Sequence, residues 1–288
     1  MAGASTVGGT LIRGENINSV VKVFAAKKFK LKPLLMNTSS NKWTETYYKE
    51  DPDILTASGT RNIKGIGRLS SFPTVEASWT PTSAQHFKYG DEGIISMEDI
   101  LTDAINVQAR TMRKISESIV NAIDSAIYTA LTAETNTAGT VAAVAAWDAD
   151  AASTRDPIQD ILRGIQAMDE NNYDALEGGV LLVNPHDYAS LMMNSKVINN
   201  PSFKTADVVS NGRVGQIAGL TIVKTTSVSD DEAMIIKNQV SATWMSVVGM
   251  TTAIIKNEGI STTIRSWEIG QIQITDPKAI YTITNTEE

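Results

Sequence analysis

The sequence of 288 residues contains no cysteine and only two histidines. Disulfides, thiolate metal ligands and a cysteine nucleophile are therefore excluded. No apolar run approaches the roughly 18 residues that a membrane-spanning helix requires. The apolar segment Val20–Ala26 is interrupted by Lys22, so it does not have the pattern of a secretory signal. We therefore expect a protein that is made and kept in a cytoplasm and has no contact with a membrane.

Basic residues are also fewer than acidic residues. Lysine and arginine total 25 against 32 acidic residues, a net charge of −7, which argues against a protein that binds nucleic acid over its whole surface. Residues 16–44 are the exception, because they contain no acidic residue. A solvated segment explains such a run, and so does contact with DNA or a neighbouring subunit. The lysines concerned are Lys22, Lys27, Lys28, Lys30 and Lys32.

Motifs for catalysis or cofactor binding are missing as well. His86 and His186 lie far apart and in no metal-binding spacing, and the chain has neither a nucleophile elbow nor a phosphate-binding loop. Asp148-x-Asp150 and the acidic run 229–232 lack the ligand spacing of a calcium loop. We predict no catalytic residue, no cofactor, no metal site and no small-molecule substrate.

One long helix is the clearest element that is present. Ser96 and Asp99 form a capping-box-like start, and apolar residues then recur at steps of three and four as far as Leu131, without proline or glycine. This predicts a helix over 97–132, roughly 54 Å long. A coiled coil or bundle is the alternative. The chain has only one such helix and no sustained pattern of flanking charges, which favours a helix lying across a sheet.

The segments around this helix differ in composition. Residues 1–20 are small and polar and predict a flexible arm. Residues 43–95 predict a long, glycine-punctuated β-hairpin with few core residues, which needs cover from another chain because its edges would otherwise be exposed. Residues 133–155 predict a linker or surface loop.

The C-terminal half predicts a compact α/β unit and a group of strands. Asp156-Pro157 and Asn184-Pro185 each predict the start of a helix, the first with Ile158, Ile161, Leu162, Ile165 and Met168 on one face. Together with strands at 180–183, 220–224 and 234–237 they define the unit at 156–240. The predicted tail strands, expected to form the sheet under the long helix, are 251–256, 260–267, 269–274 and 279–284.

This order of parts resembles the major capsid protein family of tailed viruses, with the Hong Kong 97-like fold. Local stretches match as well. They are Phe87–Ser96 leading into Met97–Leu101, Leu182–Leu191, Val214–Val223 and Thr275–Ile280.

The resemblance implies an α+β fold with an N-terminal arm, an extended loop called the E-loop, a peripheral domain with a long spine helix, and an inserted axial α/β domain. The implied boundaries are 1–42 for the arm, 43–88 for the E-loop, 89–152 and 246–288 for the peripheral domain, and 153–245 for the axial domain.

The implied function is structural. The resemblance implies a non-enzymatic major capsid protein that assembles in the host cytoplasm into hexamers and pentamers of an icosahedral virion shell. Its implied partners are copies of itself, a portal, possible scaffolding or decoration proteins, and enclosed double-stranded DNA with weak non-specific contact. Candidate contacts between subunits lie in or next to the E-loop: Trp43, Tyr47, Tyr48, Lys49, Arg61, Lys64 and Arg68.

Two alternatives remain. An encapsulin, the shell protein of a cellular nanocompartment, shares this fold. The second alternative is a ligand-binding or enzyme domain at 156–240 with an N-terminal strut. Some capsid proteins of the family cross-link Lys to Asn between subunits, but no Asn partner or catalytic Glu stands out beside Lys49 or Lys64.

Overall fold

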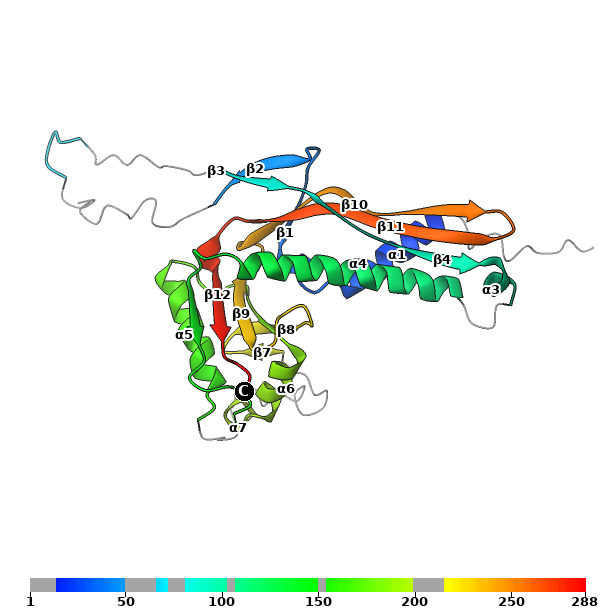
Figure 1. Cartoon of the computed structure of the whole chain (residues 1–288). Coiled ribbons are helices and arrows are strands. Elements are labelled where there is room, and N and C mark those ends of the chain that lie inside the picture. The colour runs from blue at the N-terminus through cyan, green and yellow to red at the C-terminus, as the bar shows by residue number, and fades with distance from the viewer. Residues whose placement is uncertain (1–13, 50–65, 72–80, 103–106, 150–153, 199–214) are drawn as a thin grey trace, which may run out of the picture. The chain divides into compact units, whose positions relative to one another are not determined.

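The computed structural model describes residues 14–49, 66–71, 81–102, 107–149, 154–198 and 215–288. The chain forms two compact units, and each is built from separate segments (Figure 1). We call residues 1–45, 84–130 and 243–273 the sheet–helix unit, and residues 46–83, 131–242 and 274–288 the α/β unit. In the described part of the chain, no helix is both long and apolar enough to cross a membrane.

The sheet–helix unit contains a four-stranded sheet in the order β1-β10-β11-β4. Strand β1 pairs in parallel with β10, and β11 pairs antiparallel with β4 over ten residue pairs. The predicted tail strand 251–256 begins earlier than expected, as part of β10, and the two predicted strands 260–267 and 269–274 form the single strand β11. The bounds are Met36–Ser39 for β1, Phe87–Ser96 for β4, Ala242–Asn257 for β10 and Ser261–Ile274 for β11.

The predicted long helix is present on both sides of residues 103–106, which lie outside the described residues. It appears as α3, Met97–Thr102, and α4, Val107–Thr132. A Cβ atom on Gly93 of β4 would lie 2.4 Å from the Thr111 Cγ2 of α4, so the helix packs directly on the sheet. The prediction that this helix rests on a sheet is confirmed. Its buried residues are Met112, Ile115, Ser116, Ile119, Val120, Ile123, Asp124, Ile127, Tyr128 and Leu131.

The N-terminal segment contains more regular structure than its composition predicted. Helix α1 spans Gly14–Lys28, and the 3-10 helix η2 spans Lys32–Leu34. Val21 and Ala25 are buried, so the expectation of a flexible arm up to residue 20 is wrong for the part from Gly14. Apolar residues at 20, 21, 24 and 25 form a helical stripe that the surrounding lysines obscured.

The α/β unit contains a six-stranded mixed sheet in the order β5-β12-β9-β6-β8-β7. The strands are β5 Gly139–Ala142, β6 Gly179–Val183, β7 Gln216–Ile217, β8 Leu220–Lys224, β9 Glu232–Lys237 and β12 Ile280–Thr284. The helices are α5 Pro157–Glu170, α6 Pro185–Met193, α7 Ser195–Ile198 and the 3-10 helix η4 Pro277–Ala279. The predicted compact unit and its helix starts are confirmed, with Asp156 and Asn184 as side-chain caps.

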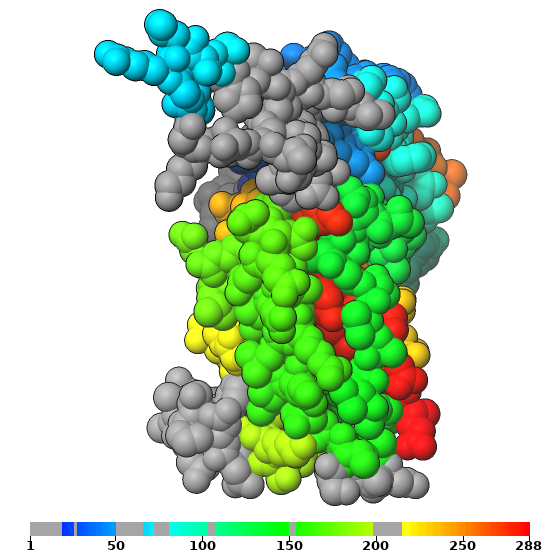
Figure 2. Space-filling model, turned by 90° about the vertical axis from the view of Figure 1, so that its left-hand side faces the viewer, coloured from blue at the N-terminus to red at the C-terminus, as the bar shows by residue number. Residues whose placement is uncertain are grey.

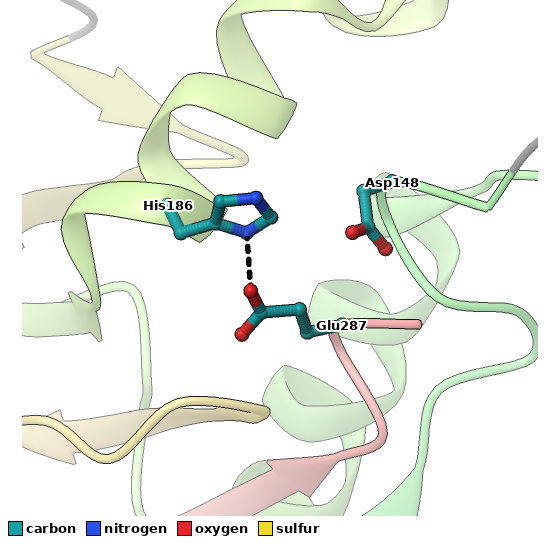
Figure 3. Close-up of side chains that lie close together, drawn as sticks. All are labelled: Asp148, His186 and Glu287. Atoms are coloured by element: carbon teal, nitrogen blue, oxygen red, sulfur yellow. Dashed lines mark ion pairs between the residues drawn. The ribbon is translucent and has the colours of Figure 1, made fainter.

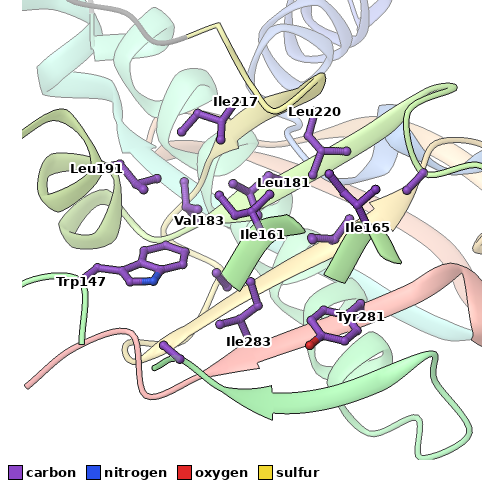
Figure 4. Close-up of a cluster of buried hydrophobic side chains, with 14 of the residues drawn as sticks. Trp147, Ile161, Ile165, Leu181, Val183, Leu191, Ile217, Leu220, Tyr281 and Ile283 are labelled. Carbon is purple, nitrogen blue, oxygen red and sulfur yellow. The ribbon is translucent and has the colours of Figure 1, made fainter. Parts of the chain in front are cut away.

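The core of this unit lies between the sheet and its helices (Figure 4). Ile161, Ile165 and Met168 of α5 are buried, whereas Leu162, predicted on the same face, is half exposed. A Cβ on Gly164 would lie 2.6 Å from Ile235 Cδ1, so α5 approaches the sheet closely. Figure 2 views the unit from the α5 side, where β5 and the C-terminal segment run beside this helix.

Two predictions for this region are wrong. Residues 133–155 are not simply a surface loop, because β5 pairs in parallel with β12 and Trp147 is fully buried. The Trp147 indole donates a hydrogen bond to the buried carboxylate of Asp160, 3.2 Å away. Strand β12 does not join the sheet that carries the long helix; it pairs with β5 and β9 instead. Composition cannot reveal either fact, because strand pairing across more than a hundred residues decides both.

The hairpin predicted over 43–95 is represented by two paired strands, β2 Thr44–Tyr48 and β3 Pro81–Gln85. The prediction is wrong for residues 87–95, which belong to β4 and pair with β11 instead. At its base, the backbone N–H of His86 donates to the carbonyl of Trp43 at 3.1 Å. Residues 50–65 and 72–80 lie outside the described residues. The described residues of the predicted E-loop are therefore mainly those at its base.

Candidate assembly surfaces

The hairpin presents aromatic side chains to solvent. Trp43 is 51% exposed and Tyr48 is 54% exposed, while Tyr47 is partly buried. Arg68 is also exposed. The predicted contact residues Arg61 and Lys64 lie outside the described residues. We call Trp43, Tyr47 and Tyr48 together the hairpin surface, with Tyr47 and Tyr48 on opposite faces of β2. Half-exposed aromatic residues of this kind are enriched at protein–protein contacts.

Lys49, which was predicted as an inter-subunit contact, has a partner within its own chain. Its ammonium group forms an ion pair with Glu134, which follows α4 and is largely buried. The pair fixes the start of the loop after β2 to the α/β unit. This partner does not test a role for Lys49 between subunits, and that role stays a prediction.

The N-terminal lysines have different surroundings. Lys22 and Lys30 are exposed, and Lys28 forms an ion pair with Glu117 at 3.3 Å. The side chain of Lys27 lies outside the described part of the structure. Lys32 differs from the others, because its ammonium group bonds to the buried carboxylate of Glu268 on β11.

Glu268 is the centre of a buried polar group in the sheet–helix unit. Its side chain is 1% exposed, and its Oε1 also accepts a hydrogen bond from the Trp244 indole at 3.2 Å. The ammonium of Lys32 lies 4.7 Å from the ring centroid of Phe29 and 5.4 Å from that of Trp244. Burial, and then the negative charge of Glu268, raise the pKa of Tyr89. The Lys32 ammonium group therefore contributes to the fold of its own chain, through Glu268 and the two aromatic rings.

The side chain of Asp124 on α4 holds residues 30–32 through the backbone N–H groups of those residues. Its carboxylate accepts the N–H groups of Lys30 at 2.9 Å and of Leu31 and Lys32 at 3.4 Å each. Burial raises the pKa of Asp124, although the three N–H groups act in the opposite direction. Residues 30–32, which lie within the predicted arm 1–42, are therefore hydrogen-bonded to the long helix.

A group of exposed apolar residues lies along the chain near the ends of β4 and β10, at the start of β11 and in α3. The β11–β4 register places Ser96 opposite Ser261, and the Met97 N–H bonds to the carbonyl of Ile260 at 3.0 Å. Leu101 is 74% exposed and Ile260 is 69% exposed. We call this cluster the apolar tip; its members are Ile94, Met97, Leu101, Ile255 and Ile260. Sequence reasoning missed it, because only strand register brings residues near 95 and 260 together.

Three ionisable side chains meet in the α/β unit (Figure 3). Asp148 follows β5, His186 lies in the first turn of α6, and Glu287 follows β12. The Nδ1 of His186 lies 3.0 Å from the Glu287 Oε1. No local pattern indicates this group, since its members are distant along the chain and the only acidic motif that includes Asp148 is Asp148-x-Asp150.

Comparison with known proteins identifies the family. The phage capsid protein family matches residues 79–283. No curated protein sequence matches the chain significantly. The fold is similar to that of several solved structures, all at sequence identities that support the fold alone.

One similar structure is a virus-like particle from Pyrococcus furiosus, with a TM-score of 0.64 at 14% identity over 93% of this chain and 98% of that chain. The capsid of cyanophage P-SCSP1u has a TM-score of 0.68 at 11% identity, covering 90% of this chain and 88% of that one. The corresponding values for Mycobacterium phage Che8 are 0.60 and 16%, with 100% and 94% covered.

These findings agree with the Hong Kong 97-like fold inferred from the order of the parts, and they do not favour the nanocompartment or enzyme alternatives. The protein is structural and not an enzyme. The chain belongs to the phage capsid protein family and is a subunit of the icosahedral shell of a bacteriophage.

Proposed function

We propose that this subunit closes the shell through three surfaces: the hairpin surface, the apolar tip, and exposed apolar side chains of the α/β unit. The observation that carries the proposal is the hairpin. An isolated pair of strands is marginally stable at best, and half-exposed aromatic residues on it are stabilised when another chain covers them. In the assembled shell, the E-loop of one subunit lies over the sheet–helix unit of its neighbour.

The apolar tip forms a second contact with another subunit. Its side chains belong to strand ends and to one short helix, so a partner meets a surface whose backbone is fixed by the β11–β4 pairing. An apolar cluster of this kind at the end of a sheet favours association when it is removed from water.

The α/β unit supplies contacts around the five-fold and six-fold axes. Copies related by rotation use the same surface, so apolar residues on one face are repeated around the axis. Candidates among the exposed residues are Val144, Leu162, Leu176 and Met193.

The enclosed genome is double-stranded DNA held by weak contacts. A net charge of −7 disfavours tight binding to the inner wall. Lys22 and Lys30 remain the exposed candidates for contact with DNA or a neighbour. A portal, possible scaffolding or decoration proteins, and assembly in the host cytoplasm complete the proposed function.

The test is deletion of residues 50–70, which leaves β2 and β3 in place. We expect the purified variant to form no closed shells in negative-stain electron microscopy while its circular dichroism stays that of a folded chain. The matched control replaces the same residues with an equally long glycine–serine segment, which retains loop length but not side chains. Closed shells from both variants would refute the proposed role of the E-loop.

A further inference from the structure

Asp148, His186 and Glu287 come from three separate segments of the α/β unit, and one potential ligand atom from each lies within 4.8 Å of the others (Figure 3). His186 and Glu287 are the closest pair, with 3.0 Å between Nδ1 and Oε1. A separation of about 3 Å is the spacing of two adjacent ligands that each lie roughly 2.1 Å from one metal ion. The His186–Glu287 pair therefore has the spacing of two adjacent ligands. The 4.8 Å span of the whole group exceeds the roughly 4.2 Å that separates two ligands on opposite sides of one such ion, so the Asp148 carboxylate would move closer on binding.

The backbone around the group is fixed. The carboxamide of Asn184 caps α6 by accepting the N–H of His186 at 3.0 Å. The N–H of Trp147 donates to the carbonyl of Thr286 at 2.8 Å, and the N–H of Glu287 donates to Asp231 at 3.0 Å. Each candidate ligand thus belongs to a segment held by hydrogen bonds, which lowers the entropic cost of collecting the ligands.

The surroundings carry uncompensated negative charge. Asp187, next to His186, is 1% exposed; its Oδ2 accepts from Thr286, but its Oδ1 has no partner among the described residues. Within the described ranges, no lysine or arginine forms an ion pair with Asp148, Asp187 or Glu287. A bound cation would offset this charge.

We propose that Asp148, His186 and Glu287 bind a divalent transition-metal ion of the zinc class, through the His186 Nδ1 and one oxygen of each carboxylate. An imidazole nitrogen with two carboxylates suits zinc better than magnesium or calcium, which prefer oxygen ligands throughout. His186 is half exposed, so water completes the coordination shell.

The ion would connect segments that are distant in the chain. It joins the loop after β5, the first turn of α6 and the segment after β12, so it closes large loops within one unit. Binding to the folded state alone raises the stability of that state. This role is independent of the proposed contacts between subunits.

The test is a zinc titration of the full-length chain by calorimetry after treatment with EDTA. We expect about one ion per chain. Binding should be at least tenfold weaker in His186→Gln and in Glu287→Gln, and unchanged in the control Glu177→Gln, an exposed carboxylate of the same unit. Cobalt absorption spectra should show a nitrogen ligand in the wild type and in Glu177→Gln but not in His186→Gln, because the second histidine, His86, is buried elsewhere.

Three outcomes would overturn the site. The wild type could bind no zinc, His186→Gln could bind as tightly as the wild type, or magnesium could displace zinc at equal concentration. Since none of these readouts involves shell formation, their failure leaves the proposed assembly function untouched.

Discussion

Substitution of Asp124 by alanine tests how the N-terminal segment is held on the long helix. The carboxylate is buried and accepts three backbone N–H groups from residues 30–32. Hydrogen bonds to a charged acceptor contribute about 1.5–3 kcal/mol each. We assign the full contribution to the bond at 2.9 Å. The two bonds at 3.4 Å exceed the usual N–H···O range, so we assign them together the contribution of roughly one bond.

The gross loss in Asp124→Ala is therefore about 3–6 kcal/mol. Part of it is recovered, because burial raises the pKa of this carboxyl and its removal relieves that cost. We expect a net loss of about 2–4 kcal/mol in the local stability of residues 29–35. Amide exchange of Lys30, Leu31 and Lys32 should then accelerate roughly 30- to 1,000-fold.

Hydrogen–deuterium exchange measured by mass spectrometry on peptides covering residues 29–35 reports this directly. Asp124→Asn retains one acceptor oxygen and should give an intermediate rate. Asn121→Ala, an exposed position three residues earlier on α4, is the matched control and should leave exchange unchanged. Wild-type exchange rates in Asp124→Ala would refute the view that this carboxylate holds the segment.

Three further predictions concern close packing, assembly and pH. In Gly179→Ala the new Cβ would lie 2.0 Å from a backbone oxygen, so denaturant titration should show that the free energy of unfolding falls by about 1–3 kcal/mol. In the control Gly215→Ala the new Cβ has nothing within 4 Å, so the free energy of unfolding should change by no more than about 0.5 kcal/mol. Equal effects of the two substitutions would contradict this packing. Leu101→Asp at the apolar tip should reduce the yield of closed shells in electron microscopy without unfolding the chain, while the control Thr132→Asp, also at an exposed position, should assemble normally. Burial raises the pKa of Asp160 above its ordinary 3.8. The folded chain therefore keeps this proton to higher pH than the unfolded chain, and stability falls as the pH rises from about 4 through the raised pKa. Asp160→Asn should flatten that fall in denaturant titrations across the same window, and an unchanged slope would count against the assignment.

Elements with strong local signals could be predicted from the sequence. Helices α5 and α6 begin at a capping residue followed by proline, and β6 is an uninterrupted apolar run, so neighbouring residues alone determine them. Strand β5 has no such signal, because its residues are mostly exposed and its place depends on pairing with β12.

Of the candidate surfaces, one could be predicted from the sequence and one could not. The aromatic residues of the hairpin surface were recognisable because a glycine-rich hairpin has little else to bury. The apolar tip was not recognisable, since no period in the sequence relates Leu101 to Ile260. The inward contact of Lys32 was equally hidden, because its partner Glu268 lies on a strand more than two hundred residues later.

The interleaving of the two units along the chain has a consequence for protein synthesis. The sheet–helix unit needs residues 243–273 for its central strands, and the α/β unit needs residues 274–288 for β12. A ribosome must therefore release nearly the whole chain before either unit can close, and folding follows translation. A chain that ends before residue 243 lacks the central strands of the sheet–helix unit and strand β12 of the α/β unit, so it completes neither sheet, and we expect it to be left out of a growing particle.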